Sequence, residues 1–175
     1  MKIFLALILL SCAAFAQNEE AIAKAKAACG PDNIKFDAEA VESNGHLFVP
    51  QAGKALVYII AQDIIIDNCI NTCGILARIG LDGAWVGAVR EESHIHFSLD
   101  PGEHHLCANW QSRLGVRNKQ VALAGFTAEA GKIYFFRLRL VEGGRNILDL
   151  DLMNNDEGEY LVAASQLSEF HVQKP

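Results

Sequence analysis

Three histidines stand within one short stretch of this chain, Ser93 to Trp110, and could together bind a divalent metal ion. His94 and His96 are separated by one apolar residue, and a strand directs such a pair to the same side. His105 follows a Pro-Gly break. If the stretch is a β-hairpin, His105 lies diagonally opposite the pair, within reach of a shared Zn²⁺ or Cu²⁺. Alternatively, the three histidines belong to a polar sheet face that binds no ligand.

The apolar residues of this stretch favour one register of the hairpin. Pairing Leu99 with His104 places Phe97 opposite Leu106 and puts Trp110 on the same apolar face. A slip of one residue would bring polar side chains to that face, so the pattern selects the register. In this register the three histidines share the other face with the neighbouring cysteine. We also expect a buried Trp110, and a half-exposed tryptophan just after the Asp-Gly turn that precedes the hairpin.

The first residues of the chain resemble a secretory leader. Lys2 is followed by an apolar run over residues 3–10 and by Ala-Phe-Ala at 14–16, a small-x-small cleavage site. The apolar run is too short for a permanent membrane helix, and no later stretch reaches the length that one needs. We therefore expect a mature chain that starts at Gln17, without a transmembrane segment, in the periplasm, the cell envelope or outside the cell. The alternative is a lipoprotein anchored through Cys12.

Four cysteines remain after the leader: Cys29, Cys69, Cys73 and Cys107. An even number in an exported chain indicates disulfides, with three possible connectivities. Cys69 and Cys73 are spaced to close a small loop, which leaves Cys29 and Cys107 for a long-range bridge. A zinc site built from Cys69, Cys73 and histidines is the alternative, and export disfavours it.

The mature chain is long enough for one domain. Residues 17–52 are predicted to form a short N-terminal helix and a surface arm, and residues 53–175 to form the domain itself. The formal net charge is −6, and the lysines and arginines do not cluster. We therefore expect neither nucleic acid nor an anionic membrane as a partner.

Short apolar or alternating segments recur at intervals of about ten residues between turn signals, which is typical of an antiparallel β fold. Asp82-Gly83 is a strong signal for a tight hairpin turn. Asn155-Asp156-Glu157 can cap a closing helix over Glu159–Leu167. Besides the hairpin, strands are expected at 54–60, 75–81, 84–89, 120–127, 133–141 and 147–152. The sequence predicts a mainly β protein: an antiparallel sandwich or partly closed barrel with a helix at each end.

Several landmarks together resemble a bacterial family called domain of unknown function 2846. The resemblance covers roughly residues 53–142, with a weaker match to the end. The residues that carry it are Gly53–Ile60, Leu81-Asp82-Gly83 with Val86-Gly87, Leu99–His104, Ala130–Phe135 and Glu159-Tyr160-Leu161. The resemblance implies an exported protein or lipoprotein with a β-sandwich domain, and it carries over no catalytic residues.

Motifs of common catalytic and phosphate-binding sites are missing from the sequence, among them Gly-x-Ser-x-Gly, the phosphate-binding loop and His-Glu-x-x-His. We therefore expect no enzyme and no cofactor. An acidic group near the end of the chain could bind calcium, although such residues more often form a solvated strand face and a helix start. Its members are Asp149, Asp151, Asp156, Glu157 and Glu159. The expected function is binding an unidentified envelope protein or small ligand, or a structural role. The alternative is metal binding by His94, His96 and His105.

Overall fold

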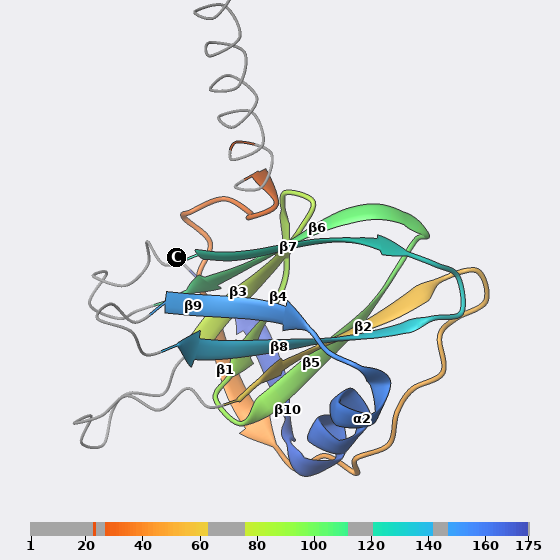
Figure 1. The fold of residues 1–175 in the computed structure, drawn as a ribbon. Coiled ribbons are helices and arrows are strands. Elements are labelled where there is room, and N and C mark those ends of the chain that lie inside the picture. The colour runs from red at the N-terminus through yellow and green to blue at the C-terminus, as the bar shows by residue number, and fades with distance from the viewer. Residues whose placement is uncertain (1–22, 24–26, 63–75, 112–120, 142–146, 175) are drawn as a thin grey trace, which may run out of the picture.

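Two β-sheets pack face to face in the part of the chain that the computed structural model describes, namely residues 23, 27–62, 76–111, 121–141 and 147–174 (Figure 1). Sheet A has the strand order β1-β10-β5-β2-β8-β9, and sheet B has the order β4-β3-β6-β7. The sheets do not close into a barrel. The predicted mainly β sandwich is therefore confirmed, and the barrel alternative is wrong.

Sheet A consists of β1 (Phe36–Val41), β10 (Gln166–Val172), β5 (Ser93–Leu99), β2 (Ala55–Ala61), β8 (Ile133–Val141) and β9 (Ile147–Leu152). Sheet B consists of β4 (Ala84–Arg90), β3 (Leu76–Leu81), β6 (Gly102–Trp110) and β7 (Val121–Ala128). Helix α2 (Asn155–Ala164) lies between β9 and β10 in the chain. The leader, most of the predicted N-terminal helix and the Cys69–Cys73 pair fall outside the described residues.

Strand β2 is central, and all seven of its residues are buried. It pairs with β5 on one side and with β8 on the other. Its odd-numbered residues, such as Val57 and Ile59, face the core between the sheets. Its even-numbered residues, such as Tyr58 and Ile60, face a second apolar cluster on the outer side of sheet A. A strand buried on both faces needs a continuous apolar sequence, which is what this segment has.

The predicted hairpin over residues 93–110 is wrong. Strand β5 pairs with β2 and β10 in sheet A, whereas β6 pairs with β3 and β7 in sheet B. The Pro101-Gly102 break is thus a corner that carries the chain from one sheet to the other. The predicted alternation is nevertheless confirmed, since Ile95, Leu99 and Leu106 all enter the shared core. Alternation specifies which side of a strand is buried, but it is the same for a hairpin and for a corner.

Two other sequence expectations are confirmed. The Asp82-Gly83 pair joins β3 to β4, and both residues have positive φ angles, 49° and 90°, as a tight two-residue hairpin turn requires. Trp110 lies in the core with 5% of its surface exposed, whereas Trp85 is half-buried.

The closing helix begins and ends earlier than predicted. Asn154 caps it by accepting a hydrogen bond from the backbone N–H of Glu157 at 2.9 Å. The chain then continues into β10, which pairs antiparallel with β1 along six positions and parallel with β5 at two. Both β1, which lies inside the predicted surface arm, and β10 are therefore strands that the sequence did not predict.

The outer face of sheet A is covered by α2 and by residues 42–52, here called the covering loop. Leu161 and Val162 of the helix and Leu47 of the loop pack on this face. Gly158 lies against the ring of Phe135, and a side chain at this position would collide with it. In the described part of the chain, no helix is both long and apolar enough to cross a bilayer.

Candidate functional site

The three predicted metal ligands do not share a face. His94 and His96 lie on β5 with their side chains on the outer face of sheet A, next to Ile60 and Tyr58. His105 lies on β6, on the outer face of sheet B, because its neighbour Leu106 faces the core. The shared-face prediction is wrong because the hairpin that would have joined them does not form. Among the described residues, no group of three His, Cys, Asp or Glu side chains could hold a metal ion.

His94 is a buried histidine held by a hydroxyl group. Its side chain is covered at the junction of α2 and β10, with 3% of the residue exposed. Its Nδ1 lies 2.9 Å from Oγ of Ser165. Burial, and secondarily the nearby His96, lower the pKa of His94 from 6.5 to about 4. The imidazole is therefore neutral at pH 7.

His96 contacts two aromatic rings. It stacks on Phe48 of the covering loop with ring centroids 4.5 Å apart, and the ring of Tyr58 lies 5.4 Å away on the other strand. Burial lowers the pKa of His96. Its Nδ1 is buried without a hydrogen-bond partner among the described residues. We call His94, His96, Tyr58 and Phe48 the imidazole cluster.

Tyr58 connects the imidazole cluster to its cover. Its hydroxyl oxygen accepts a hydrogen bond from the backbone N–H of Phe48 at 2.9 Å. Burial raises the pKa of Tyr58, and this hydrogen bond partly offsets the effect. The phenol is therefore neutral at pH 7, like both imidazoles. An uncharged cluster of this kind stabilises the covering loop and is sensitive to acid.

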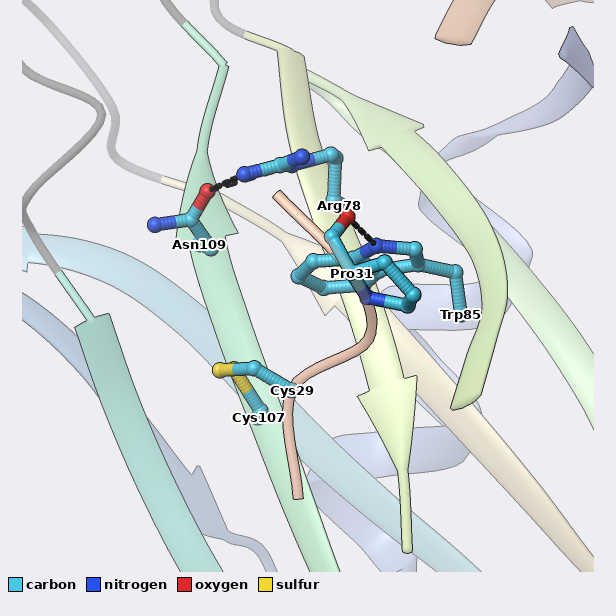
Figure 2. Close-up of a disulfide and its surroundings, with 6 residues drawn as sticks. All are labelled: Cys29, Pro31, Arg78, Trp85, Cys107 and Asn109. Carbon is cyan, nitrogen blue, oxygen red and sulfur yellow. Dashed lines mark hydrogen bonds between the residues drawn. A yellow bond between two sulfur atoms is a disulfide. The ribbon is translucent and has the colours of Figure 1, made fainter. Parts of the chain in front are cut away.

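The outer face of sheet B carries the predicted long-range bridge, because Cys29 and Cys107 form a disulfide with Cα atoms 5.2 Å apart (Figure 2). The bridge holds residues 27–35, here called the strap, against β3 and β6. A Cβ on Gly80 of β3 would lie 2.6 Å from the carbonyl oxygen of Ala28, so the close approach of the strap requires glycine at this position.

Arg78 of β3 fastens the strap with polar contacts. Its guanidinium donates hydrogen bonds to Oδ1 of Asn109 and, at 2.6 Å, to the carbonyl oxygen of Ile34. It also lies over the ring of Trp85, 4.4 Å from the centroid, and the indole Nε1 donates to the carbonyl oxygen of Pro31 at 2.8 Å (Figure 2). Arg78 and Trp85 therefore hold the strap against sheet B.

A histidine and an aspartate also meet at the corner between β5 and β6. Nδ1 of His104 lies 2.6 Å from Oδ2 of Asp82, and its Nε2 lies 2.8 Å from the carbonyl oxygen of Asp100. Burial alone would lower the pKa of His104, but these two acceptors and their charges outweigh it and raise the pKa. Since both ring nitrogens bond to acceptors, the group holds the corner in place and has no free nitrogen to act as a base.

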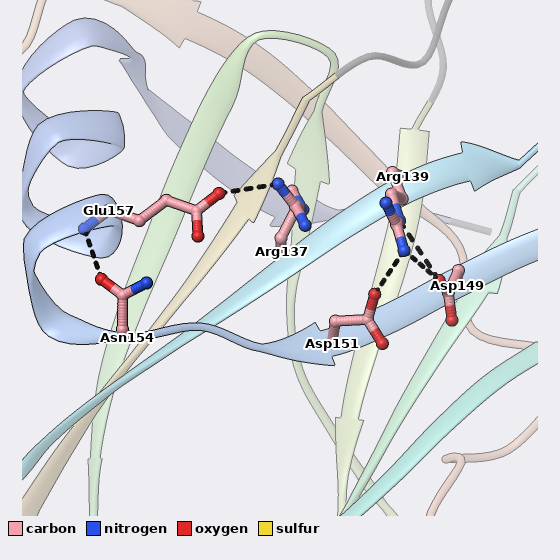
Figure 3. A network of polar contacts seen from close by, with 6 residues as sticks. All are labelled: Arg137, Arg139, Asp149, Asp151, Asn154 and Glu157. Carbon is pink, nitrogen blue, oxygen red and sulfur yellow. Dashed lines mark hydrogen bonds and ion pairs between the residues drawn. The ribbon is translucent and has the colours of Figure 1, made fainter.

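Three of the acidic residues considered for calcium are paired with arginines (Figure 3). Arg139 contacts Asp149 at 3.1 Å and Asp151 at 2.7 Å. Arg137 contacts Glu157 at 2.8 Å. These ion pairs neutralise the carboxylates that calcium would need, so the loose calcium site is not assembled within the described residues.

A pocket of about 450 Å³ opens beside the start of β8, where β9 ends and α2 begins. Its apolar lining residues are Ile133, the buried Phe135 and Met153, and the exposed Leu152. The charged residues at its rim are Glu129, Lys132 and Glu159. No motif marks these residues, because they come from a turn, two strand ends and a helix that only the fold brings together.

Comparison of the chain with protein-family models, with curated proteins and with solved structures finds no match. The resemblance to the domain of unknown function 2846 family therefore stays a prediction. The sequence also gave no sign of Ser165, Phe48 or Asp82 as partners of the histidines. Each lies far along the chain from its histidine, so only the fold could reveal the contacts.

Proposed function

We propose that the protein is an exported, non-catalytic β-sandwich that acts by binding, in the bacterial envelope or outside the cell. The Cys29–Cys107 disulfide is the observation that carries the proposal. Disulfides of this kind form and persist in oxidising compartments outside the cytosol. The leader-like residues 1–16 and the family resemblance support the same location. The pocket beside β8 supports binding as the mode of action.

The side chains of types that often act in catalysis form contacts that stabilise the fold. His94 bonds to Ser165, His104 to Asp82, and Arg78 to Asn109. The alternative function, metal binding by three histidines, requires all three on one face. His105 lies on the other sheet. Elemental analysis of untagged protein tests this directly: one equivalent of zinc or copper per chain would restore the metal alternative.

The export proposal is tested by expressing the full chain in a bacterial host, together with a variant lacking residues 2–16. We expect the full chain outside the cytosol, with Gln17 as its first residue and with Cys29 and Cys107 resistant to alkylation. The truncated variant should stay in the cytosol with reactive thiols. A lipid-modified Cys12 would establish the lipoprotein form of the proposal. An unprocessed full chain in the cytosol with free thiols would overturn it.

A further inference from the structure

Strand β8 extends beyond its partner β9 at the pocket. The two strands pair from Phe136 and Leu152 onwards, while β8 already starts at Ile133. Continuing the register would place Asn155 opposite Ile133, but Asn155 is the first residue of α2. The last contact before the helix is the hydrogen bond from the N–H of Met153 to the carbonyl oxygen of Phe135, at 2.8 Å. The chain therefore turns away and leaves the start of β8 as a strand edge.

The backbone N–H and C=O groups of Ile133 point to the edge of β8 that β9 leaves unpaired. On its other side β8 pairs with β2 through its even-numbered residues, as the bonds from Leu56 to Lys132 and from Gln62 to Leu138 show. Neighbouring residues of a strand direct their N–H and C=O groups to opposite edges. The backbone groups of Ile133, an odd-numbered residue, are thus directed at the side where β9 has ended, which is the pocket.

Residues around the pocket provide an exposed apolar side chain and a net negative charge. Leu152 has 57% of its surface exposed, which leaves an apolar side chain beside the free edge. Glu129 and Glu159 stand at the rim against the single cation Lys132, and all three are exposed. The whole chain is also acidic, with a formal net charge of −6. A positively charged partner is therefore attracted to this rim both locally and over a longer distance.

We propose that this pocket binds a short extended peptide segment of a partner protein, with apolar residues alternating with lysine or arginine. The segment lies along the start of β8, exchanges backbone hydrogen bonds with Ile133, rests an apolar side chain on Leu152 and directs a cation to Glu129 and Glu159. Strand addition of this kind takes affinity from the main chain and selectivity from side-chain contacts. The pocket volume of about 450 Å³ fits a few residues of such a segment. This inference deepens the proposed binding function by naming the class of ligand.

The test is an NMR titration of the isotope-labelled protein, purified after expression of the full chain. The probes are two blocked pentapeptides, Ac-Leu-Lys-Leu-Lys-Leu-NH₂ and its counterpart with glutamate in place of lysine. We expect saturable shifts of the Ile133 and Leu152 amide signals with the lysine peptide. The glutamate peptide should bind about twofold to fivefold more weakly per exposed charge contact. A lysine peptide N-methylated at its central leucine should also bind about threefold more weakly, because it has lost one backbone donor.

Two charge-reversal variants make the test specific. Glu129→Lys and Glu159→Lys should each weaken the lysine peptide and strengthen the glutamate peptide. Glu169→Lys, at an exposed position on β10, is the matched control and should change neither. Shifts confined to another surface, or an affinity unchanged by both rim variants, would overturn the pocket assignment. Neither result would contradict export of the chain or binding as its mode of action. Failure of the pocket assignment is therefore distinguishable from failure of the proposed function.

Discussion

The outer face of sheet A is covered by apolar and aromatic contacts, whereas the outer face of sheet B is covered by a disulfide and polar contacts. On sheet A, Leu47 and α2 seal an apolar cluster, and Phe48 stacks on His96. On sheet B, Cys29 is bonded to Cys107, and Arg78 binds the strap backbone. The first cover depends on packing and on neutral histidines. The second depends on oxidation and on a charged residue, so the two should fail under different conditions.

Removing the disulfide should have the largest effect and should act on sheet B. The bridge closes a loop with a sequence separation of 78 residues. For the double variant Cys29→Ala/Cys107→Ala we expect a loss of about 4 kcal/mol in the free energy of unfolding, because a bridge of this length restricts the unfolded chain. Denaturant unfolding followed by tryptophan fluorescence measures it. A loss below about 1 kcal/mol would contradict the expected restriction of the unfolded chain by the bridge.

Acid should be the corresponding test of sheet A. The pKa of His94 is lowered from 6.5 to about 4 in the folded protein, so the unfolded chain takes up the proton first as the pH falls. The stability contributed by neutral His94 is complete above pH 6.5 and is lost as the pH falls towards 4. The shift corresponds to about 3 kcal/mol.

The measurement is the free energy of unfolding between pH 7 and pH 4 for the wild type and for His94→Gln. We expect the variant to show a flatter dependence on pH, whatever its absolute stability. His46→Gln, a change in the exposed part of the covering loop, is the matched control and should keep the slope of the wild type. Equal slopes for wild type and His94→Gln would contradict the buried neutral histidine.

His104 at the corner should respond to pH with the opposite sign. Its pKa is raised in the folded protein, so its contribution is complete below its ordinary value of 6.5 and is lost as the pH rises through the raised value. His104→Ala removes two hydrogen bonds, at roughly 1 kcal/mol each. We expect a cost of about 2 kcal/mol at pH 5 and a smaller cost at pH 9. The neighbouring change His105→Ala should stay within about 0.5 kcal/mol at either pH.

Phe48→Ala should cost less stability than the loss of the disulfide, of neutral His94 or of the His104 contacts. Phe48 is 55% exposed, and its stacking on His96 contributes about 1 kcal/mol. The same change should raise the pKa of His96 towards its ordinary value, since the ring that buries it is lost; an NMR titration of the imidazole signals measures this. Phe48→Leu keeps part of the cover and should give an intermediate pKa. An unchanged pKa in both variants would show that the covering loop does not shield His96.

The sequence was sufficient to predict most strands and the direction that their side chains face. Both depend on local patterns: the alternation in β5 and the Asp82-Gly83 turn are readable within a few residues. The corner at Pro101-Gly102 shows the limit of such patterns. A break between two alternating strands permits a hairpin or a change of sheet, and the choice depends on which distant strands offer a better partner. For β5 that partner was β2, a strand whose seven residues are all buried.

The candidate site was predicted less well for the same reason. The alternation in β5 correctly predicted that His94 and His96 share a face. The strand pairing was predicted incorrectly, so His105 was expected beside them, whereas it lies on sheet B. The predicted helix over Glu159–Leu167 includes only the first two residues of β10, because Leu167 continues a helical spacing. The last four residues of β10 are all exposed, so its strand pattern is weak. Its strand character depends on β1, which lies at the other end of the chain.

Within the described sheets, β1 has β10 as its neighbour and no other strand. Just past β10, Gln173 donates a hydrogen bond to Asp37 of β1 across a separation of 136 residues. Strand β1 can therefore pair only after β10 has been synthesised. Closing so long a loop is entropically costly and slow. The order of synthesis thus delays completion of sheet A until β10 has left the ribosome. A nascent chain that cannot finish folding early stays threadable, which suits the proposed passage through a membrane channel.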